Sequence, residues 1–140
     1  MKKILLTSLL LLIACLSYSQ KREFRGAWMQ VINGQYTGLS TAAMQQKLTH
    51  QLDVLQADGV NAIIFQVRPE CDALYASKLE PWSRFLTGEQ GVAPSPYWDP
   101  LAWMVEQCHK RGMELHAWIN PYRASTASTK VFAPNHIVRT

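Results

Sequence analysis

Short apolar runs alternate with polar and glycine-containing segments along the chain, and they predict three strands. Residues 24–31 (FRGAWMQV) combine aromatic and β-branched side chains, as strands do. Residues 60–67 (VNAIIFQV) are nearly continuous apolar sequence, which is typical of a parallel strand covered on both faces. Residues 113–119 (MELHAWI) predict the third strand.

Two helices are predicted between these strands. In residues 41–57 four apolar side chains recur at spacings of four, four and three, so they share one face. They are Met44, Leu48, Leu52 and Leu55. Ser40 is suited to cap the start of this helix. Asp99, followed by a proline, is suited to cap a second helix that runs to Arg111 and is ended by Gly112.

The order strand, helix, strand, helix, strand implies right-handed parallel crossovers. We expect residues 68–98, with four prolines, to be a long loop, and no element is clear after residue 120. No glycine-rich GxGxxG turn follows the first strand, which disfavours a dinucleotide-binding fold. The predicted fold class is therefore α/β, as the N-terminal portion of a (β/α)8 TIM-type barrel. It comprises about three β/α steps, so it is incomplete.

Residues 1–19 have the pattern of a secretory signal, with two lysines, an apolar run and small residues at its end. The apolar run is shorter than the roughly 20 residues of a membrane span. Two processing sites remain open. Cleavage after Ser19 leaves Gln20 as the first residue, whereas residues 12–15 (LIAC) match a lipobox that makes Cys15 the lipidated first residue. We expect export to the periplasm, to a membrane as a lipoprotein, or to the medium, and a lipid on Cys15 is the only membrane attachment predicted.

Composition narrows the function classes. The chain has 140 residues, of which 48% are apolar and 17% charged, so it has the composition of a globular protein and its length suits one domain. The formal charge is +4, and two of the lysines lie in the predicted signal, which argues against a nucleic-acid partner. Three scattered cysteines do not make a disulfide scaffold, and no HExxH motif or CxxC pair occurs. Neither a metal nor a cofactor is predicted.

Amides, guanidinium groups and large aromatic side chains stand at the ends of the three predicted strands. They are Trp28 near the end of the first, Gln66 and Arg68 at the second, and Trp118, Asn120, Tyr122 and Arg123 at the third. Aromatic faces stack on the C–H faces of sugar rings, and amides and arginines bond to hydroxyls or carboxylates. The pattern favours a glycan-binding mouth. A core role fits Trp28 and Trp118 equally well, and His116 fits a structural histidine.

Hydrolysis of a glycosidic bond requires two carboxylates, about 5 Å apart for retention or wider for inversion. Glu70, Asp72 and Glu80 follow the second predicted strand, and Asp72 is the best placed of them. The favoured alternative is that Asp72 caps its loop or pairs with an arginine. No carboxylate pair can be named, so the catalytic residues stay unassigned and Asp72 is a weak candidate.

Three blocks of sequence stand in order from about Lys21 to Arg123: KREFRGAW, GVNAIIFQVRPECDALYASKLEPWSRFLTG and WDPLAWMVEQCHKRGMELHAWINPYR. They resemble the bacterial glycosyl-hydrolase-like family ten, which includes exported proteins and lipoproteins with an eightfold strand–helix barrel. The resemblance implies hydrolysis of glycosidic bonds in a glycan, plausible substrates being peptidoglycan or another cell-envelope polysaccharide. It also implies that six residues line the cleft, namely Gln66, Arg68, Asp72, Asn120, Tyr122 and Arg123.

The same family carries a further acidic motif, of the type DGIHFDDY, at the end of a later strand, and this sequence does not contain it. We therefore expect residues 20–140 to be a partial barrel domain that does not catalyse the reaction alone. Two alternatives remain. One is a non-catalytic glycan-binding protein of the cell envelope. The other is a truncated reading frame without a stable function, because three strands of a barrel leave an open sheet edge.

Overall fold

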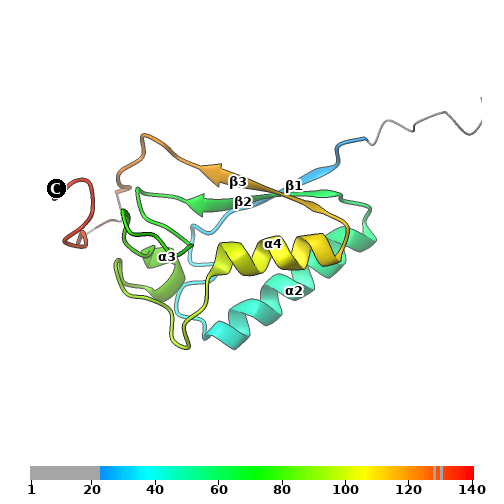
Figure 1. The fold of residues 1–140 in the computed structure, drawn as a ribbon, viewed down its shortest axis with the longest axis horizontal. Coiled ribbons are helices and arrows are strands. Elements are labelled where there is room, and N and C mark those ends of the chain that lie inside the picture. Colours follow the sequence, from blue (N-terminus) through cyan, green and yellow to red (C-terminus); the bar gives the residue numbers. More distant parts are fainter. Residues whose placement is uncertain (1–22, 128, 130) are drawn as a thin grey trace, which may run out of the picture.

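Six elements make up the part of the chain that the structure, a computed structural model, describes (Figure 1). They are β1 (Gly26–Met29), α2 (Thr41–Ala57), β2 (Ala62–Arg68), α3 (Arg84–Thr87), α4 (Pro100–Lys110) and β3 (Glu114–Ile119). The described residues are 23–127, 129 and 131–140. The predicted signal at residues 1–19, with Cys15, lies outside them, so its processing stays a prediction.

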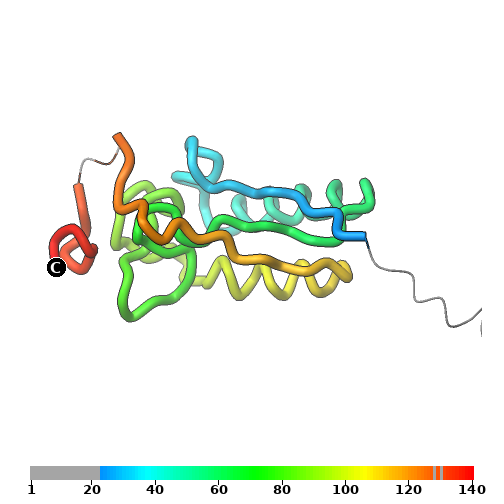
Figure 2. Tube along the Cα trace, turned by 90° about the horizontal axis from the view of Figure 1, so that it is seen from above, coloured from blue at the N-terminus to red at the C-terminus, as the bar shows by residue number. Residues whose placement is uncertain are grey.

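The three strands form one sheet in the order β1-β2-β3, and both neighbouring pairs are parallel. In the register, Trp28 lies opposite Ile64, and Ile64 lies opposite His116. Both long helices, α2 and α4, lie on the same side of the sheet (Figure 1). Figure 2 looks onto the other side, where the strands run in front of the helices. We call this second side the uncovered face.

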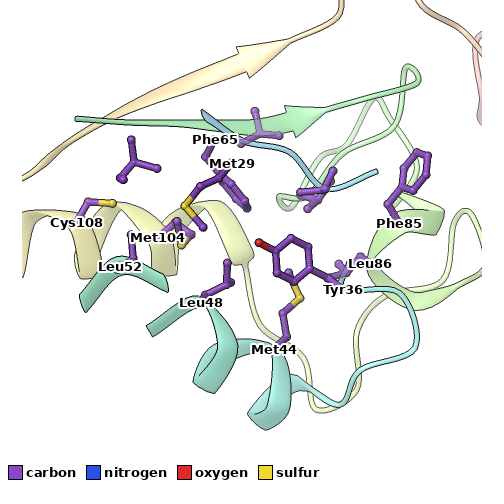
Figure 3. Close-up of a cluster of buried hydrophobic side chains, with 14 of the residues drawn as sticks. Met29, Tyr36, Met44, Leu48, Leu52, Phe65, Phe85, Leu86, Met104 and Cys108 are labelled. Carbon is purple, nitrogen blue, oxygen red and sulfur yellow. The ribbon is translucent and has the colours of Figure 1, made fainter. Parts of the chain in front are cut away.

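Side chains alternate between the two faces, as the pleat of a strand requires. Ile63 and Phe65 of β2 are fully buried in the core cluster with the helices. Figure 3 shows Phe65 on the side of the sheet that faces them. Ile63 and Phe65 meet a helix stripe whose buried members are Met44, Leu48, Leu52, Met104 and Cys108. The predicted stripe of the first helix is confirmed, with Leu55 packed at its margin. Burial raises the pKa of the Cys108 thiol to about 11, so this thiol stays protonated at neutral pH.

The predicted N-caps of both long helices are confirmed. Helix α2 begins and ends where it was predicted, and the Ser40 hydroxyl accepts a hydrogen bond from the N–H of Ala43 at 3.2 Å. At α4 the Asp99 carboxylate accepts one from the N–H of Ala102 at 2.9 Å. Strands β1 and β2 each begin two residues later than expected, at Gly26 and Ala62. Just before β2, Asn61 bonds to the segment before β1 both through its backbone N–H, to the oxygen of Arg25, and through its side chain.

The prediction of a long loop without elements between β2 and α4 is wrong. Helix α3 lies within it, and Ala73 forms an isolated bridge with Trp82. Ser83 caps α3 by accepting from the N–H of Phe85 at 3.3 Å. A helix of four residues has too few positions to show a periodic pattern, and the burial of Phe85 and Leu86 stabilises it instead.

The predicted α/β class and the parallel strand–helix alternation are confirmed. Closure into an eightfold barrel goes beyond the three strands described and stays a prediction. Within the described residues, no helix combines the length and the apolar character that crossing a bilayer requires.

Candidate functional site at the carboxyl edge of the sheet

The strand ends bring most of the predicted site residues to one edge, because the carboxyl ends of parallel strands meet there. Trp28 and Trp118 form an edge-to-face pair, with ring centroids 4.9 Å apart and planes at 77°. Strand β2 lies between β1 and β3, so this contact spans the central strand on the uncovered face. Trp28 is 66% exposed, so it is not part of the core formed by the described residues.

Gln66 stands opposite Trp118 in the register and is fully buried. Its Oε1 accepts a hydrogen bond from the backbone N–H of Val31 at 3.1 Å, which ties β2 to the end of β1. Its Nε2 has no hydrogen-bond partner among the described residues. A buried donor without a partner is costly, so this amide is the least satisfied polar group of the edge.

Arg68 is paired. Its Nε donates to Glu80 Oε1, and Glu80 Oε2 also accepts from the hydroxyl of Tyr75 at 3.2 Å. Its Nη1 donates to the backbone oxygen of Asn120 at 3.0 Å. Burial raises the pKa of Tyr75, and the Glu80 carboxylate adds to the rise, so the phenol stays a hydrogen-bond donor. Arg68 therefore links β2, its following loop and the end of β3.

Asn120 has both ends of its side chain engaged. Its Oδ1 accepts from the indole N–H of Trp118 at 2.9 Å, and its Nδ2 donates to the backbone oxygen of Pro69 at 3.1 Å. The next residues of this loop differ, because Tyr122 is 98% exposed and Arg123 is also exposed. Of the predicted third-strand residues, Tyr122 and Arg123 thus face solvent while Asn120 is bonded within the protein.

Asp72 is fully buried. Its Oδ1 accepts from the N–H of Glu70 and its Oδ2 from Nε2 of Gln90, each at 3.1 Å. Burial raises the pKa of Asp72, and hydrogen bonds from Gln90, Glu70 and Ser83 act against that rise. This is the geometry of a loop-capping aspartate. Contact of Asp72 with a substrate stays a prediction.

The sequence did not single out the pairing of Glu70 with Arg84. The two form a bidentate ion pair, with Nε 3.0 Å and Nη2 3.2 Å from the two carboxylate oxygens, and Glu70 is fully buried. Thr129 also donates to Glu70 at 3.0 Å, and His136 Nε2 lies 2.8 Å from its backbone oxygen. Burial alone would raise the pKa of Glu70, but the bonds from Arg84, Thr126 and Thr129 outweigh it and lower the pKa.

No local pattern in the sequence signals this pairing, because the partners of Glu70 are distant in the chain. Arg84 lies 14 positions away and Thr129 lies 59 positions away. The only hint is that Arg84 stands in the block PWSRFLTG, which carries part of the resemblance.

Three hollows lie among the described loops at this edge, the largest of them, of about 600 Å³, lined in part by Arg84 and Gln90. A second, of about 390 Å³, includes Arg68, Cys71 and Glu80 in its lining, and the third, of about 510 Å³, includes Arg84 and Thr126. Among the residues that the structure describes, no three His, Cys, Asp or Glu side chains are grouped as a metal site requires.

Parallel strands with helices on one face, and polar and aromatic groups at the carboxyl edge, define an α/β protein of the kind whose ligands bind at the strand ends. The comparison with family models then identifies the family. The chain belongs to the family Glycosyl hydrolase-like 10, whose model matches residues 23–138. This confirms the resemblance found in the sequence, and the protein is glycosyl hydrolase-like.

Curated relatives carry corresponding names. The chain is 45% identical over 112 residues to Glycosyl hydrolase YngK of Bacillus subtilis (strain 168), which covers 77% of this chain and 22% of that protein. It is 49% identical over 81 residues to Glycosyl hydrolase DigH of Escherichia coli (strain K12), which covers 58% of this chain and 18% of that protein. The chain thus spans about a fifth of the length of these relatives.

Proposed function

We propose that the protein is an exported glycoside hydrolase that cleaves glycosidic bonds in a cell-envelope glycan, either peptidoglycan or another polysaccharide. The observation that carries this proposal is the Trp28–Trp118 pair at the carboxyl edge of the uncovered face, where Trp28 is exposed and Trp118 half-buried. Aromatic rings in this position are suited to the C–H faces of sugar rings. The family and the printed names of its relatives support the reaction type.

The proposal includes the barrel. In a (β/α)8 barrel helices cover the outside only, and the helix-free face of the sheet becomes the interior. That interior opens at the carboxyl ends of the strands into the mouth where substrates bind, and Trp28 and Trp118 stand near those ends. The one-sided placement of α2 and α4 fits this arrangement (Figure 1). The length of the relatives, about five times the matched segment, leaves room for the remaining strand–helix units.

None of the three carboxylates after β2 is assigned the role of catalytic acid or nucleophile. Glu70 is paired with Arg84, Glu80 with Arg68, and Asp72 caps its loop. A general acid needs a proton and access to the leaving oxygen, and a nucleophile needs a free oxygen. The proposed function therefore draws its carboxylate pair from other parts of the protein.

The same pairing supports a second function, glycan binding without hydrolysis. In that case the aromatic pair, Tyr122 and Arg123 hold the glycan, and no carboxylate takes part in chemistry.

The test uses the full-length protein as its gene encodes it. The protein is incubated with purified peptidoglycan, with chitohexaose and, as the control glycan, with cellohexaose. Release of new reducing ends is the result expected of a hydrolase. Co-sedimentation with peptidoglycan without release of reducing ends supports the binding function. If the protein neither binds nor cleaves any of these glycans, the proposal fails.

Localisation is tested separately on the same protein. Mass spectrometry of the mature N-terminus distinguishes a chain that starts at Gln20 from one that starts at lipidated Cys15. A mature protein that still carries Met1 would contradict export.

A further inference from the structure

The indole of Trp118 is held by a single amide. Trp118 Nε1 donates to Asn120 Oδ1 at 2.9 Å, and Asn120 Nδ2 donates to the backbone oxygen of Pro69 at 3.1 Å. An indole nitrogen can only donate and a proline carbonyl can only accept. The two partners therefore fix which end of the Asn120 amide points where, and both polar ends of this side chain are used within the protein.

The backbone of Asn120 is held by two hydrogen bonds to Arg68. The backbone N–H of Asn120 donates to the oxygen of Arg68 at 3.0 Å, and Arg68 Nη1 donates back to the oxygen of Asn120, also at 3.0 Å. The backbone bond continues the β2–β3 pairing one residue past the end of β3, and the bond from the Arg68 guanidinium reinforces it. A side chain on a backbone held in this way keeps its contacts more precisely than one on a free loop.

Trp118 in turn supports Trp28. The rings meet edge to face at 4.9 Å, and Trp28 is the exposed member of the pair. Edge-to-face aromatic pairs have a preferred geometry, so a turn of one ring displaces the other. The orientation of the exposed ring thus depends on the indole that Asn120 fixes.

We propose that Asn120 is a positioning residue whose amide holds the Trp118 indole, so that Trp28 and Trp118 present a fixed aromatic surface to a pyranose ring. Asn120 itself does not bond to the sugar. This changes the role that the family resemblance gives Asn120, from cleft contact to support. The inference rests on the proposed glycan binding, but its first test does not require a glycan.

The first test is spectroscopic and uses the full-length protein. Two indoles in edge-to-face contact give an exciton couplet in circular dichroism. Trp98 and Trp103 form a second such pair at 5.7 Å, so the contribution of the Trp28–Trp118 pair is taken as the difference between wild type and Trp118→Phe. We expect Asn120→Leu to lose most of this difference. Asn120→Asp keeps an acceptor for the indole but loses the donor to Pro69, so it should retain more of the difference than Asn120→Leu.

Asn61→Leu is the matched control. Like the Asn120 amide, the Asn61 amide makes two bonds, in its case both to backbone: it accepts from the N–H of Arg25 at 2.9 Å and donates to the oxygen of Glu23 at 2.6 Å. It stands before β2, at the opposite end of the sheet, so its loss should leave the couplet intact. A couplet that persists in folded Asn120→Leu overturns the inference. If that variant does not fold, Asn120→Ser takes its place.

The second test is a double-mutant cycle on affinity for chitohexaose. Asn120→Leu removes the hydrogen bond that holds the Trp118 indole. The loss of one such bond corresponds to about a fivefold loss of affinity, so this variant of the otherwise wild-type protein should bind chitohexaose about fivefold more weakly. In the Trp118→Phe background the indole N–H is absent, and the same change should then matter by less than about twofold. An equal loss in both backgrounds would mean that Asn120 touches the sugar, which overturns the positioning role.

Failure of the proposed function and failure of the inference about Asn120 give different results. If wild type binds neither chitohexaose nor peptidoglycan, the proposed function fails, and the couplet still decides whether Asn120 orients Trp118.

Discussion

Two buried regions of this molecule are held together by different forces. The first is the helix layer, formed by α2, α4 and the covered face of the sheet, where the buried side chains are almost all apolar. The second is the set of loops at the carboxyl edge, where buried and half-buried polar groups bond to one another across the chain. We call this second region the edge cluster; it comprises Glu70, Asp72, Arg84, Gln90, Thr126, Thr129 and His136.

The difference lies in how much each residue depends on one partner. An apolar side chain in the helix layer touches many neighbours, and its contribution scales with the area it buries. A polar group in the edge cluster needs a particular donor or acceptor, because an unpaired buried group is costly. A substitution in the helix layer should therefore lower stability in proportion to the side-chain volume that it removes. A substitution in the edge cluster should lower stability according to the hydrogen bonds or ion pairs that it removes.

The largest expected effect is in the helix layer. Leu48 of α2 is fully buried, and Leu48→Ala should lower the free energy of unfolding by about 3–5 kcal/mol, through lost burial and the cavity it leaves. Urea unfolding of the full-length protein measures this change.

Leu79→Ala is the control, since the Leu79 side chain is 85% exposed and should change stability by less than about 0.5 kcal/mol. Equal effects of the two variants would mean that the helix layer is not a packed core.

A smaller loss is expected from the edge cluster. Glu70→Gln keeps the shape of the side chain but removes the charge that pairs with Arg84, and it should cost about 2–3 kcal/mol at neutral pH. Glu106→Gln is the control. Glu106 pairs with Lys110 on the exposed surface of α4, and such pairs contribute little.

The Glu70 effect should depend on pH with a defined sign. The folded state lowers the pKa of Glu70 below its ordinary value of 4.5, so the ionised carboxylate stabilises the fold above that value. As the pH falls through the lowered folded-state pKa, this contribution is lost. The stability gap between wild type and Glu70→Gln should be constant from neutral pH down to about 5 and then close. A gap that widens in acid would contradict the pairing.

The smallest stability change belongs to neither region. Trp28 stands near the carboxyl end of β1, at the mouth of the proposed barrel, and Trp28→Ala should cost only about 1 kcal/mol of stability, chiefly the ring pair with Trp118. Its affinity for chitohexaose should nevertheless fall about tenfold or more, because a stacking surface is removed.

Tyr97→Ala is matched to this change. Tyr97 is also 66% exposed and also meets another ring, Trp82, edge to face at 5.9 Å, but it precedes α4 rather than standing on the sheet. Its loss should leave glycan affinity unchanged. If both variants bind equally well, the uncovered face is not the glycan surface.

The same contrast explains what the sequence could predict. Helix α2 was found because its stripe and its Ser40 cap are local signals, contained within one element. The edge cluster was not, because Glu70 meets Thr129 and His136 across 59 and 66 positions. The residue types at the strand ends were recognised as polar and aromatic. Which of them bond inward, as Arg68 and Asn120 do, depends on loop paths that no local pattern encodes.

The parallel register of the sheet also has a consequence for folding. Neighbouring strands are joined only by long crossovers: Arg25 meets Asn61 36 positions on, and Arg68 meets Asn120 52 positions on. Contacts this distant in sequence form slowly, since loop closure precedes any gain from pairing. During synthesis β1 and β2 can pair while β3 is still to be made. The aromatic surface across β2 is therefore completed only after β3, the third of these strands, has added Trp118.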